Sequence, residues 1–163
     1  MRTIKFRGKR VDNGEWISGS LDLTANSATI LWDRTDKDGD TAPWFANVDP
    51  DTVGQFTGLL DENEKEIYEG DIIYGCFKYD RLSADGCVIP DNDCLCRGVV
   101  KFSEQSLQWV LDILWAEYHI RRWMEEEDES EIPIVHFGYE SSEYPMECLE
   151  VIGNIHEKTE HTK

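Results

Sequence analysis

Apolar residues in this chain come in short runs, in which they often alternate with polar residues. In Thr3–Arg7, for example, Ile4 and Phe6 fall on one face and Lys5 and Arg7 on the other, which is typical of a half-buried strand. Segments rich in Gly, Asn and Asp separate these runs, and such residues favour tight turns. The pattern predicts a mainly β fold of bent antiparallel strands that form a small barrel or sandwich, with at most one or two short helices.

The predicted strands share this alternation or a run of β-branched and aromatic residues. They are Thr3–Arg7, Glu15–Leu23, Ala28–Trp32, Trp44–Val48, Val53–Leu60, Lys65–Tyr68, Ile72–Tyr79, Gly98–Phe102, Leu107 to about Asp112, Ile134–Tyr139 and Leu149–His156. Asn13-Gly14 suits a tight hairpin between the first two, and Trp44–Val48 is expected to pair with Ala28–Trp32. Gly19 lies inside a strand, where it indicates a bulge or a close approach of backbones, and Gly153 lies inside the closing strand, where it indicates a bend or a bulge.

Two further segments break the simple alternation. Asp80–Arg97 contains several Gly, Pro, Asp and Asn residues, so we expect a loop there, and we expect Gly75 to interrupt the strand before it. In residues 106–126, apolar residues recur at helical spacing, but those from Leu107 onwards also alternate as in a strand. We expect a strand to about Asp112, followed by a short helix or an irregular segment through Met124.

The stretch Val53–Asp71, VGQFTGLLDENEKEIYEGD, has the densest succession of strand and turn residues in the chain. Asp61-Glu62-Asn63-Glu64 separates two apolar runs with side chains that bond to their own backbone. In Glu69-Gly70-Asp71, the glycine can take a positive φ at little cost. The stretch therefore predicts a strand, a hairpin, a short strand, a sharp turn and a long strand, with the turn carboxylates accepting backbone N–H groups.

The same stretch resembles a protein family. V-G-Q-F-T-G-L followed by D-x-N-x-K-E-I-Y-E-G-D-I is similar to the signature of the YopX-like family of small bacteriophage and prophage proteins. Three further segments resemble that family, in the family's order. They are Ile4-Lys5-Phe6-Arg7 with Trp16 and Gly19, then Gly98–Phe102, and finally Glu150–His156. The resemblance implies a mainly β fold with an SH3-like barrel element, and it implies no known reaction.

Because the resemblance covers both ends and the middle of the chain, a single YopX-like domain is expected over residues 1–163. Variable insertions are expected at about 30–48, 76–97 and 113–147, where the resemblance is weak. The signature positions are expected to be structural, and no catalytic or binding residue is assigned. These positions are Gly54, Thr57, Gly58, Asp61, Glu69, Gly70, Asp71, Gly153 and Asn154.

The formal net charge of -18, from 34 acidic and 16 basic residues, limits what the protein is expected to bind. Phosphate contacts need a basic face, so direct nucleic-acid binding is not expected. One interpretation of the acidity is solubility alone. The alternative is an acidic surface that imitates DNA and occupies a host nucleic-acid-binding protein, for which Glu125–Glu131, EEEDESE, is the best candidate. Basic residues cluster near the N-terminus. One interpretation is a solvated strand face, and the alternative is an anchor for an acidic tail or an anionic ligand.

The five cysteines are an odd number, so they cannot all pair within the chain. Cys76, Cys87, Cys94 and Cys96 are weak candidates for a zinc site, because neighbouring thiolates bind zinc. Their spacing is not that of the usual pair of zinc knuckles. We therefore expect incidental thiols in this region, with no metal and no cofactor.

No motif specific for catalysis is found in the sequence, which lacks a phosphate-binding glycine loop, G-x-S-x-G and H-E-x-x-H. We expect a non-enzymatic, phage-derived module that binds an unidentified protein partner. The second hypothesis is the acidic DNA mimic. The third is an enzyme with a carboxylate site at Asp61, Glu69 and Asp71.

The N-terminal sequence MRTIKFRGKR lacks the apolar core of a signal peptide. No apolar run approaches the roughly 18 residues of a membrane span. We therefore expect a cytoplasmic location in the bacterial host, with reduced thiols and no membrane association. Homo-oligomerisation is left open.

Overall fold

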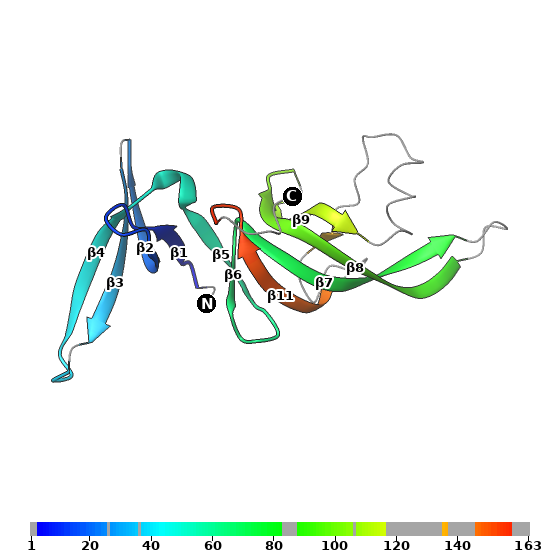
Figure 1. Cartoon of the computed structure of the whole chain (residues 1–163), viewed down its shortest axis with the longest axis horizontal. Helices are drawn as coiled ribbons and strands as arrows, with labels where there is room; N and C mark the ends of the chain where they lie inside the picture. The colour runs from blue at the N-terminus through cyan, green and yellow to red at the C-terminus, as the bar shows by residue number, and fades with distance from the viewer. Residues whose placement is uncertain are drawn as a thin grey trace. The chain divides into compact units, whose positions relative to one another are not determined.

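The computed structural model describes residues 3–25, 27–35, 37–82, 88–105, 107–116, 135–136 and 146–157, without the side chains of residues 77–94 and of the residues from 115 to 147. Its regular elements are β1 (Phe6–Lys9), β2 (Trp16–Thr24), β3 (Ser27–Thr35), β4 (Thr41–Val48), the 3-10 turn η1 (Pro50–Thr52), β5 (Gly54–Leu60), β6 (Glu66–Tyr68), β7 (Asp71–Leu82), β8 (Val88–Ser103), β9 (Gln108–Ala116), β10 (Val135–His136) and β11 (Met146–Asn154) (Figure 1). The prediction of a mainly β, antiparallel fold is confirmed. Within these ranges, no helix is long and apolar enough to cross a membrane.

The chain divides into two compact units, Met1–Gly58 and Leu59–Lys163. In the first unit the strand order is β4-β3-β2-β1-β5, and in the second β10-β9-β8-β7-β11. Strand β5 begins in the first unit and ends in the second, where β6 follows it. These are open sheets, and no barrel closes within the described ranges. The single domain and its variable insertions stay predictions.

In the first unit, β2 changes its partner halfway along its length. Its first half pairs with β1, as far as Phe6 opposite Gly19, and its second half pairs with β3, starting from Ser20 opposite Leu31. A Cβ atom added at Gly19 would overlap the backbone carbonyl of Leu31, so the predicted close approach of backbones is confirmed. Beneath this junction, Ala28, Ile30 and Val48 form a small buried core.

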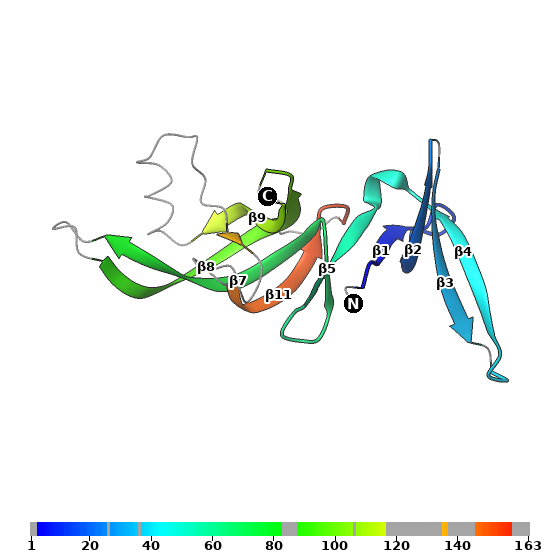
Figure 2. The same ribbon diagram turned by 180° about the vertical axis from the view of Figure 1, so that it is seen from behind.

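The second unit is built on a long antiparallel pair, β7 and β8, with β11 beside β7 and β9 beside β8 (Figure 2). Its buried core includes Ile67, Ile73, Val100, Leu111 and Val151. These residues come from five different strands, so the core forms only when distant parts of the chain are brought together.

The predicted loop over Asp80–Arg97 is wrong for residues 80–82 and 88–97, because β7 continues to Leu82 and β8 starts at Val88. Residues 83–87 lie outside the described ranges. The register shifts between Tyr79 and Arg81, so that one residue of β7 lies opposite Pro90 and its neighbour in β8. Proline has no N–H for the ladder, and a bulge is where a strand accommodates it. Gly75 also does not interrupt β7, since it pairs within the ladder.

The predicted end of a strand at Asp112 is also wrong. Strand β9 runs from Gln108 to Ala116 and pairs with β8 from one end to the other, with a register shift between Ile113 and Trp115. In this segment the apolar residues therefore follow the alternation of a strand, and their helical spacing does not correspond to a helix. The part of the expected helix or irregular segment beyond residue 116 lies outside the described ranges, and of the strand expected over 134–139 only Val135–His136 is described, as β10.

Other predicted features are confirmed. Gly14, in the first hairpin, has a φ of 73° and donates its N–H to the Arg10 carbonyl at 2.9 Å. Strand β3 pairs with β4 with Trp32 opposite Trp44. The register of β11 shifts between Val151 and Gly153, as expected for a bulge.

Candidate functional site

Asp61 is a buried carboxylate in the turn between β5 and β6. Its Oδ1 accepts the backbone N–H groups of Asn63 at 2.8 Å and of Lys65 at 2.9 Å. Its Oδ2 accepts the N–H of Val151 at 3.1 Å, from a residue 90 positions further along the chain. One side chain therefore shapes its own turn and attaches the closing strand β11 to it.

The surroundings of Asp61 set its protonation state. Burial raises the pKa of this carboxyl, but the N–H groups of Lys65, Val151 and Asn63 lower it and outweigh burial, so that its pKa lies below the ordinary value. The Lys65 charge acts in the same direction. A general acid at neutral pH needs a raised pKa, so the environment of Asp61 suits a fixed acceptor better than an acid catalyst.

Asp71 is the second buried carboxylate of the signature stretch, with 1% of its surface exposed. Its Oδ2 accepts the N–H of Tyr68 at 2.9 Å, and its Oδ1 accepts the side-chain amide of Asn154 at 3.2 Å. Asn154 in turn accepts the N–H of His156 through its Oδ1, at 2.9 Å. Asp71 and Asn154, which are both signature positions, therefore connect the second turn to the end of β11.

Gly70 completes this connection through its backbone. It has a φ of 82°, donates its N–H to the Val100 carbonyl at 2.9 Å, and accepts the N–H of Ile155 at 3.0 Å. Three segments of the second unit therefore meet at this residue. The positive φ explains why glycine suits this position, because side chains with a Cβ rarely adopt it.

Gly70→Val is expected to lower the free energy of unfolding by about 2 kcal/mol, because a β-branched residue is strained at positive φ. The matched variant Gly70→Asn should cost less, since asparagine tolerates this region better. Urea denaturation of both variants measures the difference. A valine variant as stable as the wild type would refute the strain argument.

The other signature positions are spread over both units. Gly54 lies opposite Arg7 in the β1–β5 pairing, Thr57 is buried, Gly58 has a φ of 92°, and Glu69 is half-buried. The two buried carboxylates, Asp61 and Asp71, are each oriented by backbone N–H groups of their own turn and by β11. The carboxylate enzyme site stays a prediction.

The cysteine region lies on β7 and β8. Cys76 is opposite Leu95, and the buried Cys96 is opposite Gly75. Within the described part of the chain, no three His, Cys, Asp or Glu side chains are placed to hold a metal ion. Cys87 and the side chain of Cys94 lie outside that part, so the four-cysteine zinc candidate stays a prediction.

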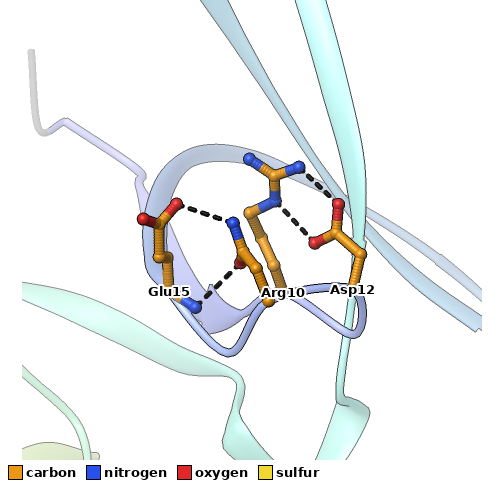
Figure 3. Close-up of polar contacts among 4 residues, drawn as sticks. Arg10, Asp12 and Glu15 are labelled. Atoms are coloured by element: carbon orange, nitrogen blue, oxygen red, sulfur yellow. Dashed lines mark hydrogen bonds and ion pairs between the residues drawn. The ribbon is translucent and has the colours of Figure 1, made fainter.

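The basic residues near the N-terminus are ordered by local contacts. Arg10 donates two hydrogen bonds to Asp12, at 2.9 and 2.6 Å (Figure 3), and this guanidinium lowers the pKa of the Asp12 carboxyl. The Arg7 guanidinium and the Lys9 ammonium lie 4.7 and 5.2 Å from the centre of the Trp16 ring, which is within the range of cation–π attraction. The Trp16 ring is therefore engaged by cations, which makes it a poor platform for a stacked nucleic-acid base.

An exposed aromatic ribbon is the feature that sequence reasoning missed. Beyond Leu31, the partner of β3 is β4, and these two strands extend as a ribbon (Figure 1). The exposed fractions are 39% for Leu31, 47% for Trp44 and 73% for Phe45. The signal was the adjacent pair Trp44-Phe45: neighbours on a strand point to opposite faces, so one of them had to point away from the core.

The family model described as YopX protein matches residues 5–161, which include both signature turns and β11. No curated protein and no solved structure matches the chain. Because the family match spans nearly the whole sequence, the chain belongs to the YopX protein family.

Proposed function

We propose that this protein is a non-enzymatic, phage- or prophage-derived module of the bacterial cytoplasm that acts by binding another protein. The observation that carries the proposal is the exposure of Trp44 and Phe45 on opposite faces of the β3–β4 ribbon. Aromatic residues are enriched in protein interfaces. Adjacent aromatic residues that are both exposed are therefore more consistent with a binding surface than with a core.

The energetics of the ribbon support this proposal. Phe45 lies opposite Leu31, at the point where β2 stops pairing with β3 and the ribbon continues with two strands. Burying an exposed phenylalanine contributes about 1.5–3 kcal/mol. A partner that covers Phe45 would therefore gain affinity, and one that also covers the two-stranded part would stabilise it, because a two-stranded ribbon alone is only marginally stable in water.

The signature carboxylates also favour a binding protein over an enzyme. Asp61 and Asp71 accept backbone N–H groups that fix two turns. An enzyme with these two carboxylates and Glu69 in a cleft is the weaker proposal, because a reacting group would have to compete for oxygens that already hold the fold together.

The DNA mimic is the second candidate, and the distribution of charge favours it. Residues 59–163 hold 25 of the 34 acidic residues but only 9 of the 16 basic ones, so the excess of negative charge lies in the second unit. A mimic would hold a nucleic-acid-binding protein through these carboxylates, and moderate salt would release that protein.

Phe45→Ser is expected to reduce the amount of bound protein recovered from a bacterial lysate by at least about tenfold, which corresponds to about 1.4 kcal/mol of lost burial. The immobilised wild type and variants are compared by mass spectrometry of the eluates. Ile4→Ser is the matched control, because Ile4 is also an exposed apolar residue of the first unit, with 69% exposure.

Equal recovery on the wild type and on Phe45→Ser would contradict binding through the ribbon. If the bound protein also elutes at moderate salt and binds nucleic acid, the DNA mimic becomes the better account.

A further inference from the structure

The face of the ribbon that points away from the buried core has a simple composition. We call it the outer face, the sheet face of β2, β3 and β4 that carries Asp22, Leu31, Asp33, Pro43 and Phe45. The registers place Leu31 opposite Phe45, Asp33 opposite Pro43, and Asp22 opposite Thr29. Side chains two positions apart on a strand share a face and lie about 7 Å apart. Leu31 and Phe45 therefore form an apolar row with Asp33 two positions further along β3, and Asp22 lies on the other side of the row, on the neighbouring strand β2 opposite Thr29.

Where β2, β3 and β4 pair with one another, the charges on the outer face are acidic, whereas the basic Arg7 and Lys9 lie on β1, opposite Ser18 and Trp16 further along β2. Asp22 and Asp33 are exposed, and they are the charged residues on this face of the β2–β3–β4 pairings. Arg34 lies on the opposite face, with its guanidinium 4.6 Å from the centre of the Trp44 ring. An apolar row between two carboxylates complements a surface with an apolar side chain between two basic ones.

Strand addition at the edge of the ribbon is a poor alternative. Strand β4 is the edge of its sheet, and the Asn47 carbonyl on that edge already accepts the Val11 N–H at 3.1 Å. The backbone groups of Pro43 and Phe45 point the same way as those of Asn47, because they alternate along the strand. Pro43 has no N–H to donate, so the free edge is short and lacks a central donor.

A second copy of the chain is also a poor occupant of the outer face. Two outer faces packed on each other would bring carboxylates toward carboxylates, and each copy has a net charge of -18. Like charges that face each other across an interface weaken association. A basic partner gains from the same arrangement.

We infer that the outer face binds an extended segment of a partner protein that carries one apolar side chain flanked by basic residues two positions before and after it. The apolar side chain packs on Leu31 and Phe45, and the basic side chains pair with Asp22 and Asp33. This inference rests on the proposed binding function and adds the chemistry of the partner to it.

The test is a titration of the full-length, 15N-labelled chain with a synthetic peptide, Thr-Lys-Thr-Phe-Thr-Lys-Thr, followed by amide chemical shifts. Shifts are expected at Leu31, Asp33 and Phe45. A second peptide, with both lysines replaced by glutamates, should bind at least about fivefold more weakly. The double variant Asp22→Asn with Asp33→Asn should weaken the lysine peptide similarly, whereas the control Asp38→Asn with Asp40→Asn should not.

No binding of the lysine peptide, equal binding of the two peptides, or shifts confined to other strands would overturn the inference. Failure of the inference and failure of the proposed function are distinguishable. If Phe45→Ser abolishes capture of a cellular protein but the peptides do not differ, the binding function stands and the partner chemistry is wrong. If Phe45→Ser leaves capture unchanged, the binding function itself is wrong.

Discussion

Asp61→Asn is expected to lower the free energy of unfolding by about 3 kcal/mol. Asparagine keeps one oxygen for the N–H groups of Asn63 and Lys65. Its amide nitrogen, however, would stand where Oδ2 accepts the Val151 N–H. Two donors would then face each other, and a buried N–H would lose its acceptor. Chemical denaturation followed by tryptophan fluorescence measures the change.

Glu62→Gln is the control for this variant, because it removes the same charge from an exposed side chain in the same turn and should change stability by less than about 0.5 kcal/mol. The pKa of Asp61 is lowered in the folded state, so its contribution is present above the unfolded-state pKa of about 3.9 and is lost as the pH falls through the folded-state value. The difference between wild type and Asp61→Asn should therefore shrink below about pH 4. A difference that does not depend on pH, or an Asp61→Asn variant as stable as Glu62→Gln, would contradict this role.

Gly19→Ala is expected to destabilise the protein by about 3 kcal/mol, which lowers the melting temperature of a chain of this size by roughly 10 °C. The added Cβ would overlap the carbonyl oxygen of Leu31 and lie 2.9 Å from its carbonyl carbon. Both atoms belong to the backbone, so no side-chain rotation relieves the clash, and β2 would have to move away from β3. Thermal unfolding followed by circular dichroism measures the effect.

Ser20→Ala is the matched control, since Ser20 is the exposed neighbour on the same strand. A Gly19→Ala variant that melts with the Ser20→Ala variant would show that β2 and β3 do not approach closely at this point.

The features that could be predicted from the sequence are those that a few neighbouring residues determine. Asn13-Gly14 specifies a tight hairpin, because its glycine takes the positive φ that this turn requires. Gly70 does the same for the second signature turn. The alternation of apolar and polar residues identified most strands, because a half-buried strand has a period of two.

The errors lie where pairing between strands overrides local preference. The residues between Asp80 and Arg97 include many turn formers, yet most of them belong to the β7–β8 pair. A long ladder of backbone hydrogen bonds holds them, and a register shift accommodates Pro90. Local propensity could not reveal this, because the stabilising bonds come from the opposite strand.

In the candidate site, too, the local contacts could be predicted from the sequence and the long-range contacts could not. Backbone bonding by the turn carboxylates was foreseeable, because Asp61 bonds to N–H groups two and four positions away. The hydrogen bond from the Val151 N–H to Asp61 could not be predicted, because no local sequence pattern identifies a partner 90 positions away. The exposure of Phe45 was also missed, because the sequence alone does not show which face of a strand is covered.

The hydrogen bond between Asp61 and Val151 can form only late in synthesis. Ribosomes add about 5–20 residues per second, so Val151 follows Asp61 by roughly 5–20 s, since the two are 90 positions apart. Over that time Asp61 stays hydrated, and the second unit lacks the strand that closes it. The pairings of β1 to β4 and of β1 with the start of β5 involve only residues 6–55. The first unit therefore has all its strands several seconds before the second, and the β3–β4 ribbon is complete while the rest of the chain is still being made.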